Sequence, residues 1–340
     1  MKLVSYLKDN EDRLAIYHDG LVYDTHELDQ DLQDNMQDLL WEGLDAFDAL
    51  KVYDEKIKAG SIEKDKGISI DDVSLLSPVP HPTSTRDAYA FRQHVAAARK
   101  NRGVEMIPEF DQFPIFYFTN HNSTYGPGDI EMMKDHFNKL DFELEIAAVI
   151  GKPGMNVPVE EADEYIAGFM VYNDMSARVM QMQEMKLNLG PAKGKDFANA
   201  FGPYFVTPDE LEEYFVPAKD GHKGNSYDLS MKCWVNDTQV SEGNVKDMDW
   251  SFAEIIERVS YGTEIFPGDV IGSGTVGTGC FLELNGTGLR LDQNYSPQWL
   301  NDGDVVEMEI TGLGRLSNTM RLVDPEYSIL AKKKNMETAS

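Results

Sequence analysis

The stretch "LDFELEIAAVIG", residues 140–151, combines three acidic residues with the alternation of a β-strand. Because successive side chains of a strand point to opposite faces, this pattern predicts Asp141, Glu143 and Glu145 on one face. The two glutamates would lie roughly 6.5–7 Å apart, close enough to bind one cation between them. A solvated outer face would give the same alternation, but "AAVIG" is apolar on both faces and indicates a central strand. Carboxylates on such a strand need a partner, and a divalent metal ion is a suitable one.

Further candidate residues follow in two other stretches. In "GFMVYNDMSARVMQ", Asp174 comes directly after an apolar strand, where site residues often gather, although Asn-Asp also ends strands and caps helices. In "RDAYAFRQHVAAARKNRG", Asp87 and His94 are seven residues apart. A single histidine on a helix is more often structural than functional. The joint set of four acids and one histidine is what favours a metal site with a neighbouring base.

Two glycine-containing segments offer further polar groups. "LGPAKGKDFANAFGPYFVT" presents Lys193 and Lys195, which could hold an oxyanion or carboxylate or could be exposed turn lysines. "IFPGDVIGSGTVGTGCFLELNG" presents Ser273 and Thr275 on a loop whose backbone N–H groups could approach a ligand. A tight connection between strands would explain the second segment equally well.

The net charge of the chain disfavours two classes of binding partner. The 340 residues include 31 Lys+Arg and 59 Asp+Glu, a net charge of −28. Such a surface disfavours nucleic acids and anionic membranes as partners. It indicates either an ordinary acidic cytoplasmic protein or adaptation to high salt. The two cysteines are expected to be reduced, and no signal peptide or apolar run long enough to span a bilayer is evident. A site for an anionic substrate would need positive charge from a metal ion or from nearby lysine and arginine side chains.

The chain is expected to form two domains and a tail. Residues 1–78 predict a small α+β module, with strands at 2–7 and 13–18 and helical spacing of leucines within 25–60. Residues 79–330 predict a mainly β domain with a few helices, one of them at 88–100, and residues 331–340 are expected to fray. No glycine pattern of a Rossmann or P-loop fold occurs. The strand-like runs of the second domain are "FPIFYF", "DFELEIAAVIG", "YIAGFMVYND", "GPYFVT", "LSMKCWVND", "DVIGSGTV", "FLELN" and "VVEMEITGLG".

The order and spacing of these motifs resemble the fumarylacetoacetate hydrolase family from about residue 86 to 320. The matching segments are "RDAYAFRQH", "DFELEIAAVIG", "VYNDMSAR", "GPAKGKDFANAFGP", "FPGDVIGSGTVGTG" and "LNDGDVVEMEITGLGRLSN". The resemblance implies a mixed β-roll for the second domain and an SH3-like barrel for the first, as in the longer members. It also implies a homodimer.

The resemblance assigns roles to individual residues. It implies one divalent cation per subunit, Mg²⁺ or else Ca²⁺ or Mn²⁺, which all prefer oxygen ligands. His94 would be the general base and Glu283 the acid that orients it, while Lys195 and Gln181 would bind the developing oxyanion. The implied metal ligands are Asp87, Glu143, Glu145 and Asp174, and the implied substrate contacts are Tyr89, Tyr117, Arg102 and Thr275.

The activity implied by the resemblance is hydrolysis of a C–C bond in a β-diketo acid of the fumarylacetoacetate or acylpyruvate type, as in aromatic amino acid catabolism. A lyase of the same family, such as an oxaloacetate decarboxylase, a 2-keto-3-deoxy sugar-acid dehydratase or a 2-oxo-pentenoate hydratase, is the alternative. A binding protein without activity is a third reading, which the complete set of site residues disfavours. Three departures bear on the substrate: Val179 replaces a usual aspartate, Met185 stands where the hydrolase of tyrosine breakdown has a tyrosine, and the segment around "EMIPEFDQF" differs.

Overall fold

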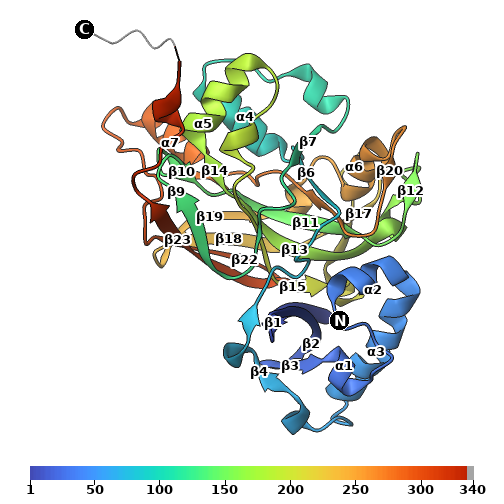
Figure 1. Ribbon diagram of the computed structural model, residues 1–340. Coiled ribbons are helices and arrows are strands. Elements are labelled where there is room, and N and C mark those ends of the chain that lie inside the picture. Colours follow the sequence, from blue (N-terminus) through green and yellow to red (C-terminus); the bar gives the residue numbers. More distant parts are fainter. Residues whose placement is uncertain (335–340) are drawn as a thin grey trace.

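The computed structural model describes residues 1–334 and shows a small module joined to a larger domain (Figure 1). The module is α+β, as expected, and the closure of its strands into an SH3-like barrel stays a prediction. Its elements are β1 (Lys2–Lys8), β2 (Glu11–His18), β3 (Leu21–Asp24), α1 (Thr25–Leu28), α2 (Met36–Glu42), α3 (Leu44–Lys58), β4 (Ile68–Ser69) and β5 (Ser74–Leu75).

One long sheet runs through both parts of the molecule. Its strands follow the order β4-β3-β2-β1-β15-β13-β11-β21-β6-β7, and β1 pairs with β15 where the module meets the larger domain. The strands of the larger domain in this sheet are β6 (Ser84–Ala88), β7 (Phe116–Thr119), β8 (Thr124–Tyr125), β11 (Leu144–Ile150), β13 (Ile166–Asp174), β15 (Asn199–Val206) and β21 (Asp269–Gly272).

A second sheet packs against the first and encloses the main core. Its order is β19-β18-β22-β23-β9, and the buried apolar side chains of both sheets form one continuous cluster. β11 and β13 are buried along their whole length, which agrees with the central position expected from "AAVIG". The strands of this sheet are β9 (Gly128–Met133), β18 (Ser230–Val235), β19 (Thr238–Asn244), β22 (Val305–Ile310) and β23 (Gly314–Asp324).

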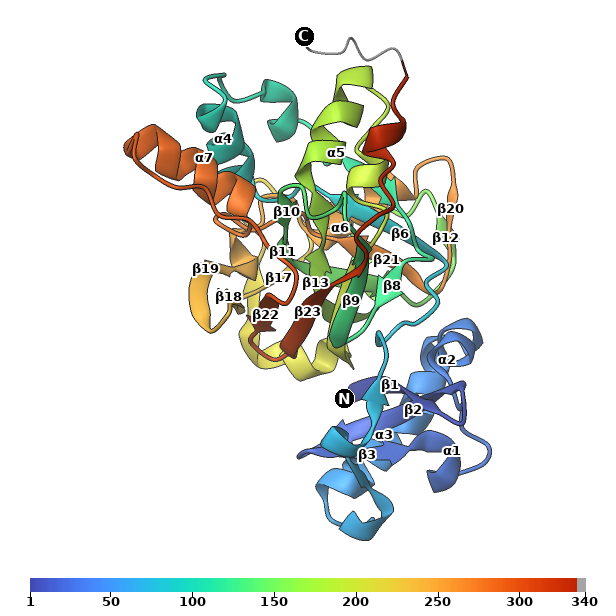
Figure 2. The same cartoon turned by 60° about the vertical axis from the view of Figure 1, so that its left-hand side comes forward.

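Helices lie at the upper end of the larger domain, with the module at the opposite end (Figure 2). In residues 1–334 no helix is long and apolar enough to cross a membrane. Part of the tail expected to fray forms a short 3-10 helix, Leu330–Lys332, and residues 335–340 lie outside the described part. The remaining elements are α4 (Arg92–Asn101), α5 (Arg178–Glu184), α6 (Phe252–Val259), α7 (Phe281–Leu291) and the strand pairs β10 (Leu140–Asp141) with β14 (Ser176–Ala177), β12 (Gly154–Met155) with β20 (Glu264–Ile265), and β16 (Phe215–Pro217) with β17 (Asn225–Tyr227).

The prediction of a strand at "FLELN" is wrong, because this run opens helix α7. The carboxylate of Asp141 accepts hydrogen bonds from the backbone N–H groups of Phe281 (2.8 Å) and Leu282 (2.9 Å). The Cys280 thiol accepts a further one from Glu283. These contacts satisfy N–H groups that the first turn of a helix leaves unpaired. Cys280 is the N-cap residue itself, whereas Asp141 lies 140 positions before Phe281, so the local pattern could not reveal the contribution of this carboxylate.

Two other boundaries differ from the predictions. The helix expected at 88–100 is α4, which begins only at Arg92, and Asp87 lies on β6, where it pairs with Tyr117 of β7. The acidic stretch is also not one strand. It breaks between β10 and β11, so Asp141 belongs to a different strand pair from Glu145.

Close packing at Gly168 connects the central sheet to the module. A Cβ atom at this position would lie 2.4 Å from Cε1 of Phe205, whose ring stacks on Phe47 of α3 at 5.8 Å. We expect Gly168→Ala to lower the free energy of unfolding by about 1–3 kcal/mol, since the fully buried ring of Phe205 would have to shift. In a Phe205→Leu background the same change should cost much less. Denaturant unfolding of the four proteins measures this, and equal costs in both backgrounds would contradict it.

Candidate active site

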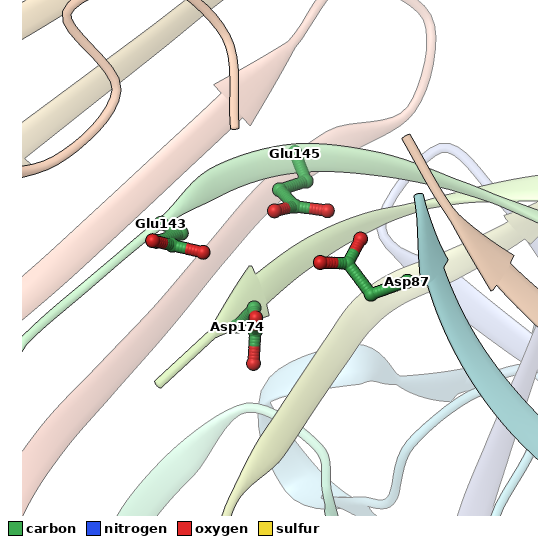
Figure 3. Close-up of side chains that lie close together, drawn as sticks. All are labelled: Asp87, Glu143, Glu145 and Asp174. Atoms are coloured by element: carbon green, nitrogen blue, oxygen red, sulfur yellow. The ribbon is translucent and has the colours of Figure 1, made fainter. Parts of the chain in front are cut away.

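Four buried carboxylates converge inside the central sheet, as Figure 3 shows. Asp87 comes from the end of β6, Glu143 from the residue before β11, Glu145 from β11 and Asp174 from the end of β13. One oxygen atom from each lies within 4.8 Å of the others. Because these strands lie within one run of the sheet, β13-β11-β21-β6, residues far apart in sequence reach a single point. The structure thus brings together all four acids expected to be metal ligands.

The glycine-rich segment after β21 makes room for this cluster. A Cβ atom at Gly272 would lie 2.6 Å from Oδ1 of Asp87. Gly274 has a φ of +81°, which favours glycine, and its backbone N–H donates to Asp87 (3.1 Å) and to Glu145 (2.9 Å). The loop therefore brings a backbone donor to the carboxylates. Thr275 follows it and is buried, and its contact with substrate stays a prediction.

The donor set fits a divalent metal ion. Oε1 of Glu145 and Oδ1 of Asp174 are buried and have no hydrogen-bond partner in the described part of the chain. Burying an ionised carboxylate oxygen without a partner is costly, so these two atoms are oriented for a ligand. Four carboxylates supply the hard oxygen donors that Mg²⁺, Mn²⁺ and Ca²⁺ prefer.

Lys195 lies within the same cluster and is buried, whereas Lys193 is exposed and pairs with Asp196. The Lys195 ammonium donates to Glu143 (2.6 Å) and to Asp174. Two of its three N–H donors are occupied in this way, which leaves one for a substrate oxygen. The lysine expected to bind an oxyanion is therefore located at the acidic cluster.

The charges of the cluster shift its pKa values in opposite directions. Burial, followed by the charge of Asp174, raises the pKa of Asp87 to about 8. Burial and the charges of Asp87 and Asp174 raise the pKa of Glu145 well above its usual range. Burial also raises the pKa of Asp174 to about 6, despite the attraction of Lys195. For Glu143 burial acts in the same direction, but the lysine and a neighbouring arginine outweigh it and lower the pKa. Protons therefore compete with a cation for this site near neutral pH.

His94 and Glu283 form a buried pair between α4 and α7. Nδ1 of His94 lies 2.6 Å from Oε2 of Glu283, and the same oxygen accepts a hydrogen bond from the backbone N–H of Thr278 (3.1 Å). A carboxylate at Nδ1 favours the tautomer that carries its proton there, which leaves Nε2 free to accept one. The ring of Tyr89 packs edge-on against His94, with the ring centroids 5.9 Å apart. The structure brings together the base and the orienting acid as expected.

The other residues predicted to contact the substrate or its oxyanion differ in their hydrogen-bond partners. The Tyr117 hydroxyl donates to Asp174 (2.7 Å). The amide oxygen of Gln181 accepts from Arg178 (3.0 Å), which leaves its NH₂ group free to donate. Arg102 is exposed at the end of α4 and donates to the carbonyl of Ala98 (3.1 Å). The substrate contacts of these residues stay predictions.

Sequence reasoning assigned no role to Arg178, which holds the cluster in place. This buried guanidinium donates to Asp141 (2.8 Å) and to Glu143 (2.8 Å), so it connects the carboxylate at the start of α7 to a candidate metal ligand. The only signal in the sequence was an arginine just after the strand that ends at Asp174. Its partner Asp141, four residues before Glu145, was expected on the metal-facing side.

We expect Mg²⁺ to stabilise the protein more at pH 8 than at pH 6. The pKa of Asp87 is about 8 in the folded protein, against 3.8 for an unperturbed aspartate, so the stability that its proton contributes is complete only below the lower value and is lost as the pH rises through about 8. A bound cation replaces that proton, and its relative benefit grows with pH. Melting temperatures with and without MgCl₂ at both pH values, at constant ionic strength, measure this difference. A larger shift at pH 6 would contradict it, and Asp87→Asn should show little shift at either pH.

Comparison with known proteins agrees with this geometry. The model of the fumarylacetoacetate (FAA) hydrolase C-terminal domain matches residues 83–321. A human protein named oxaloacetate tautomerase FAHD2A, mitochondrial, is 31% identical over 248 residues, which cover 73% of this chain and 69% of the relative.

Solved structures extend the similarity to the N-terminal module. A fumarylacetoacetate hydrolase from Exiguobacterium antarcticum has a TM-score of 0.69 and 25% identity, covering 95% of this chain and all of the other. Maleylpyruvate hydrolase from Sphingobium, solved with manganese and pyruvate, shares the fold with a TM-score of 0.65 and 21% identity, at the same coverage. The chain therefore belongs to the fumarylacetoacetate hydrolase family, whose members include hydrolases and tautomerases.

Proposed function

We propose that this protein is a metal-dependent hydrolase that cleaves a C–C bond in a β-diketo acid of the acylpyruvate or fumarylacetoacetate type. The observation that carries the proposal is the buried His94–Glu283 pair, which accompanies the four carboxylates. A proton acceptor held by a carboxylate is what activation of water requires. Relatives that hydrolyse keto acids share the fold and support the same reaction class. A homodimer remains part of the proposal.

Asp87, Glu143, Glu145 and Asp174 would hold one divalent cation, and their hard oxygen donors favour Mg²⁺ or Mn²⁺. When bound, the cation supplies a Lewis acid that polarises the keto oxygens of the substrate. Glu143 keeps contacts with both Lys195 and Arg178, so its carboxylate stays ionised and fixed in orientation.

The remaining steps belong to side chains of the protein. His94 would accept a proton from water at Nε2, and Glu283 would stabilise the imidazolium that results. The water oxygen then attacks the acyl carbonyl carbon, and the free N–H donors of Lys195 and Gln181 would bind the oxyanion that develops there. When this tetrahedral species collapses, the C–C bond breaks and its electron pair leaves with the enolate of the keto acid. The imidazolium of His94 can return a proton to that enolate carbon.

Removal of the base tests this mechanism. His94→Gln should lower the turnover of acetylpyruvate by roughly 10²–10⁴-fold, because water loses its proton acceptor. The cluster should stay intact, so the rise in melting temperature on adding Mg²⁺ should match that of the wild type. Pyruvate release, coupled to lactate dehydrogenase, measures the rate. A variant with near wild-type turnover would show that His94 is not the base.

A second candidate is proton transfer without bond cleavage, since the human relative is named an oxaloacetate tautomerase. The same histidine could move a proton at the carbon between two carbonyl groups. The lyase alternatives, decarboxylation of oxaloacetate or dehydration of a 2-keto-3-deoxy sugar acid, would use the same site.

A panel of acetylpyruvate, oxaloacetate and a 2-keto-3-deoxy sugar acid separates these reactions. The proposal expects pyruvate and acetate from acetylpyruvate as the fastest reaction. A change in the enol absorbance of oxaloacetate with no product released would indicate a tautomerase instead. Carbon dioxide release from oxaloacetate, or loss of water from the sugar acid, would indicate a lyase.

A further inference from the structure

A pocket lies beside α5, on a different face from the one that carries Gln181. Its volume is about 270 Å³. Val179, Met182, Gln183 and Lys186 line it at spacings of three, four and seven residues, which places them on one side of the helix. None of the four candidate metal ligands borders it, nor does the His94–Glu283 pair. The complete lining is Lys139, Arg178, Val179, Met182, Gln183, Lys186, Leu282 and Trp299.

The charge of this lining is opposite to that of the protein as a whole. The chain has a net charge of −28, yet three of the eight lining residues are basic and none is acidic. Lys139 and Lys186 are both exposed, and within residues 1–334 neither forms an ion pair with a carboxylate. An acidic surface repels anions at long range, so a site for an anion needs cations held close to it. This pocket supplies them.

The wall of the pocket is apolar and partly aromatic. Val179, Met182, Leu282 and Trp299 contribute it, and the Lys139 ammonium lies 5.7 Å from the centre of the Trp299 ring. A ligand with only charge, such as inorganic phosphate, would leave this wall without a partner. An apolar body next to a negative group would contact both parts of the lining.

The backbone at Lys139 adds an independent observation. Its φ is +62°, a left-handed conformation that residues with a side chain rarely adopt. The carbonyl of Lys139 accepts a hydrogen bond from the backbone N–H of Arg178 (3.1 Å), which fixes this turn to the start of α5. Glycine would fit the turn better, whereas the lysine found here contributes its side chain to the lining of the pocket.

We propose that this pocket binds a small organic carboxylate with an aromatic or branched aliphatic body. The ammonium groups of Lys139 and Lys186 would pair with the carboxylate, and the body would pack on Trp299 and Met182. The pocket and the acidic cluster share one residue, Arg178, which lines the pocket and whose guanidinium is paired with Asp141 and Glu143, so the charge available to a ligand comes from Lys139 and Lys186. This binding does not depend on the reaction proposed above.

Calorimetric titration of the Mg²⁺-loaded protein with benzoate tests the proposal, at constant ionic strength. Benzoate should bind, whereas neutral benzyl alcohol and inorganic phosphate should each bind at least about tenfold more weakly, because each lacks one of the two contacts. Lys139→Gly and Lys186→Gln should each weaken benzoate binding by about fivefold or more, as expected for loss of one charge contact. Lys139→Gly should also melt no lower than the wild type, since glycine suits a φ of +62°.

Two further variants serve as controls. Lys152 also lies over an aromatic ring, 4.3 Å from the centre of Tyr165, but it pairs with Glu164 and is remote from the pocket. Lys152→Gln should therefore bind benzoate as the wild type does. Glu145→Gln, which removes a candidate metal ligand, should keep benzoate binding. Binding that survives both lysine changes in the pocket, that is lost in Glu145→Gln, or that is undetectable up to roughly 10 mM would overturn the proposal.

Discussion

Mutual repulsion among four carboxylates in a dry sheet interior is the constraint on which the rest of the site depends. Ionised carboxylates repel one another strongly where water is excluded, and burial alone disfavours their charged forms. Lys195 and Arg178 offset part of this charge by direct contacts with Glu143 and Asp174. Burial first, and then the charges of neighbouring carboxylates, raise the pKa values of Asp87 and Glu145. A divalent cation is the simplest partner that would offset the remaining repulsion, and the two orphaned oxygens indicate where it would bind.

The same constraint explains how the surrounding structure is built. Gly274, just after β21, donates its backbone N–H to Asp87 and Glu145. At Gly272, the last residue of β21, a side chain would collide with the Asp87 carboxylate. Asp141 makes two kinds of contact. It accepts hydrogen bonds from the first turn of α7, and it accepts one from Arg178, which also bonds Glu143. α7 in turn carries Glu283 to His94. Metal site and base are therefore connected through contacts that start at one short acidic stretch.

Part of this arrangement could be predicted from the sequence and part could not. The convergence of Glu143 and Glu145 agrees with the alternation predicted for the acidic stretch, which is a local property, although Glu143 lies one residue before β11. Asp87, His94 and Asp174 could be assigned to the site only through the order of motifs in the family, since no local sequence pattern connects them. The helix at "FLELN" was missed because Asp141, far away in sequence, supplies part of its cap. The role of Arg178 depends on three-dimensional contacts with two acids and has no local signature.

The central claim is that the four acids bind one divalent cation, and anomalous diffraction from crystals grown with Mn²⁺ tests it most directly. The account predicts one strong anomalous peak per chain, within coordination distance of carboxylate oxygens of Asp87, Glu143, Glu145 and Asp174. An ordered cluster without such a peak, with Lys195 and Arg178 as the only cationic partners of the four carboxylates, would contradict the claim. A peak at some other place in the molecule would do the same.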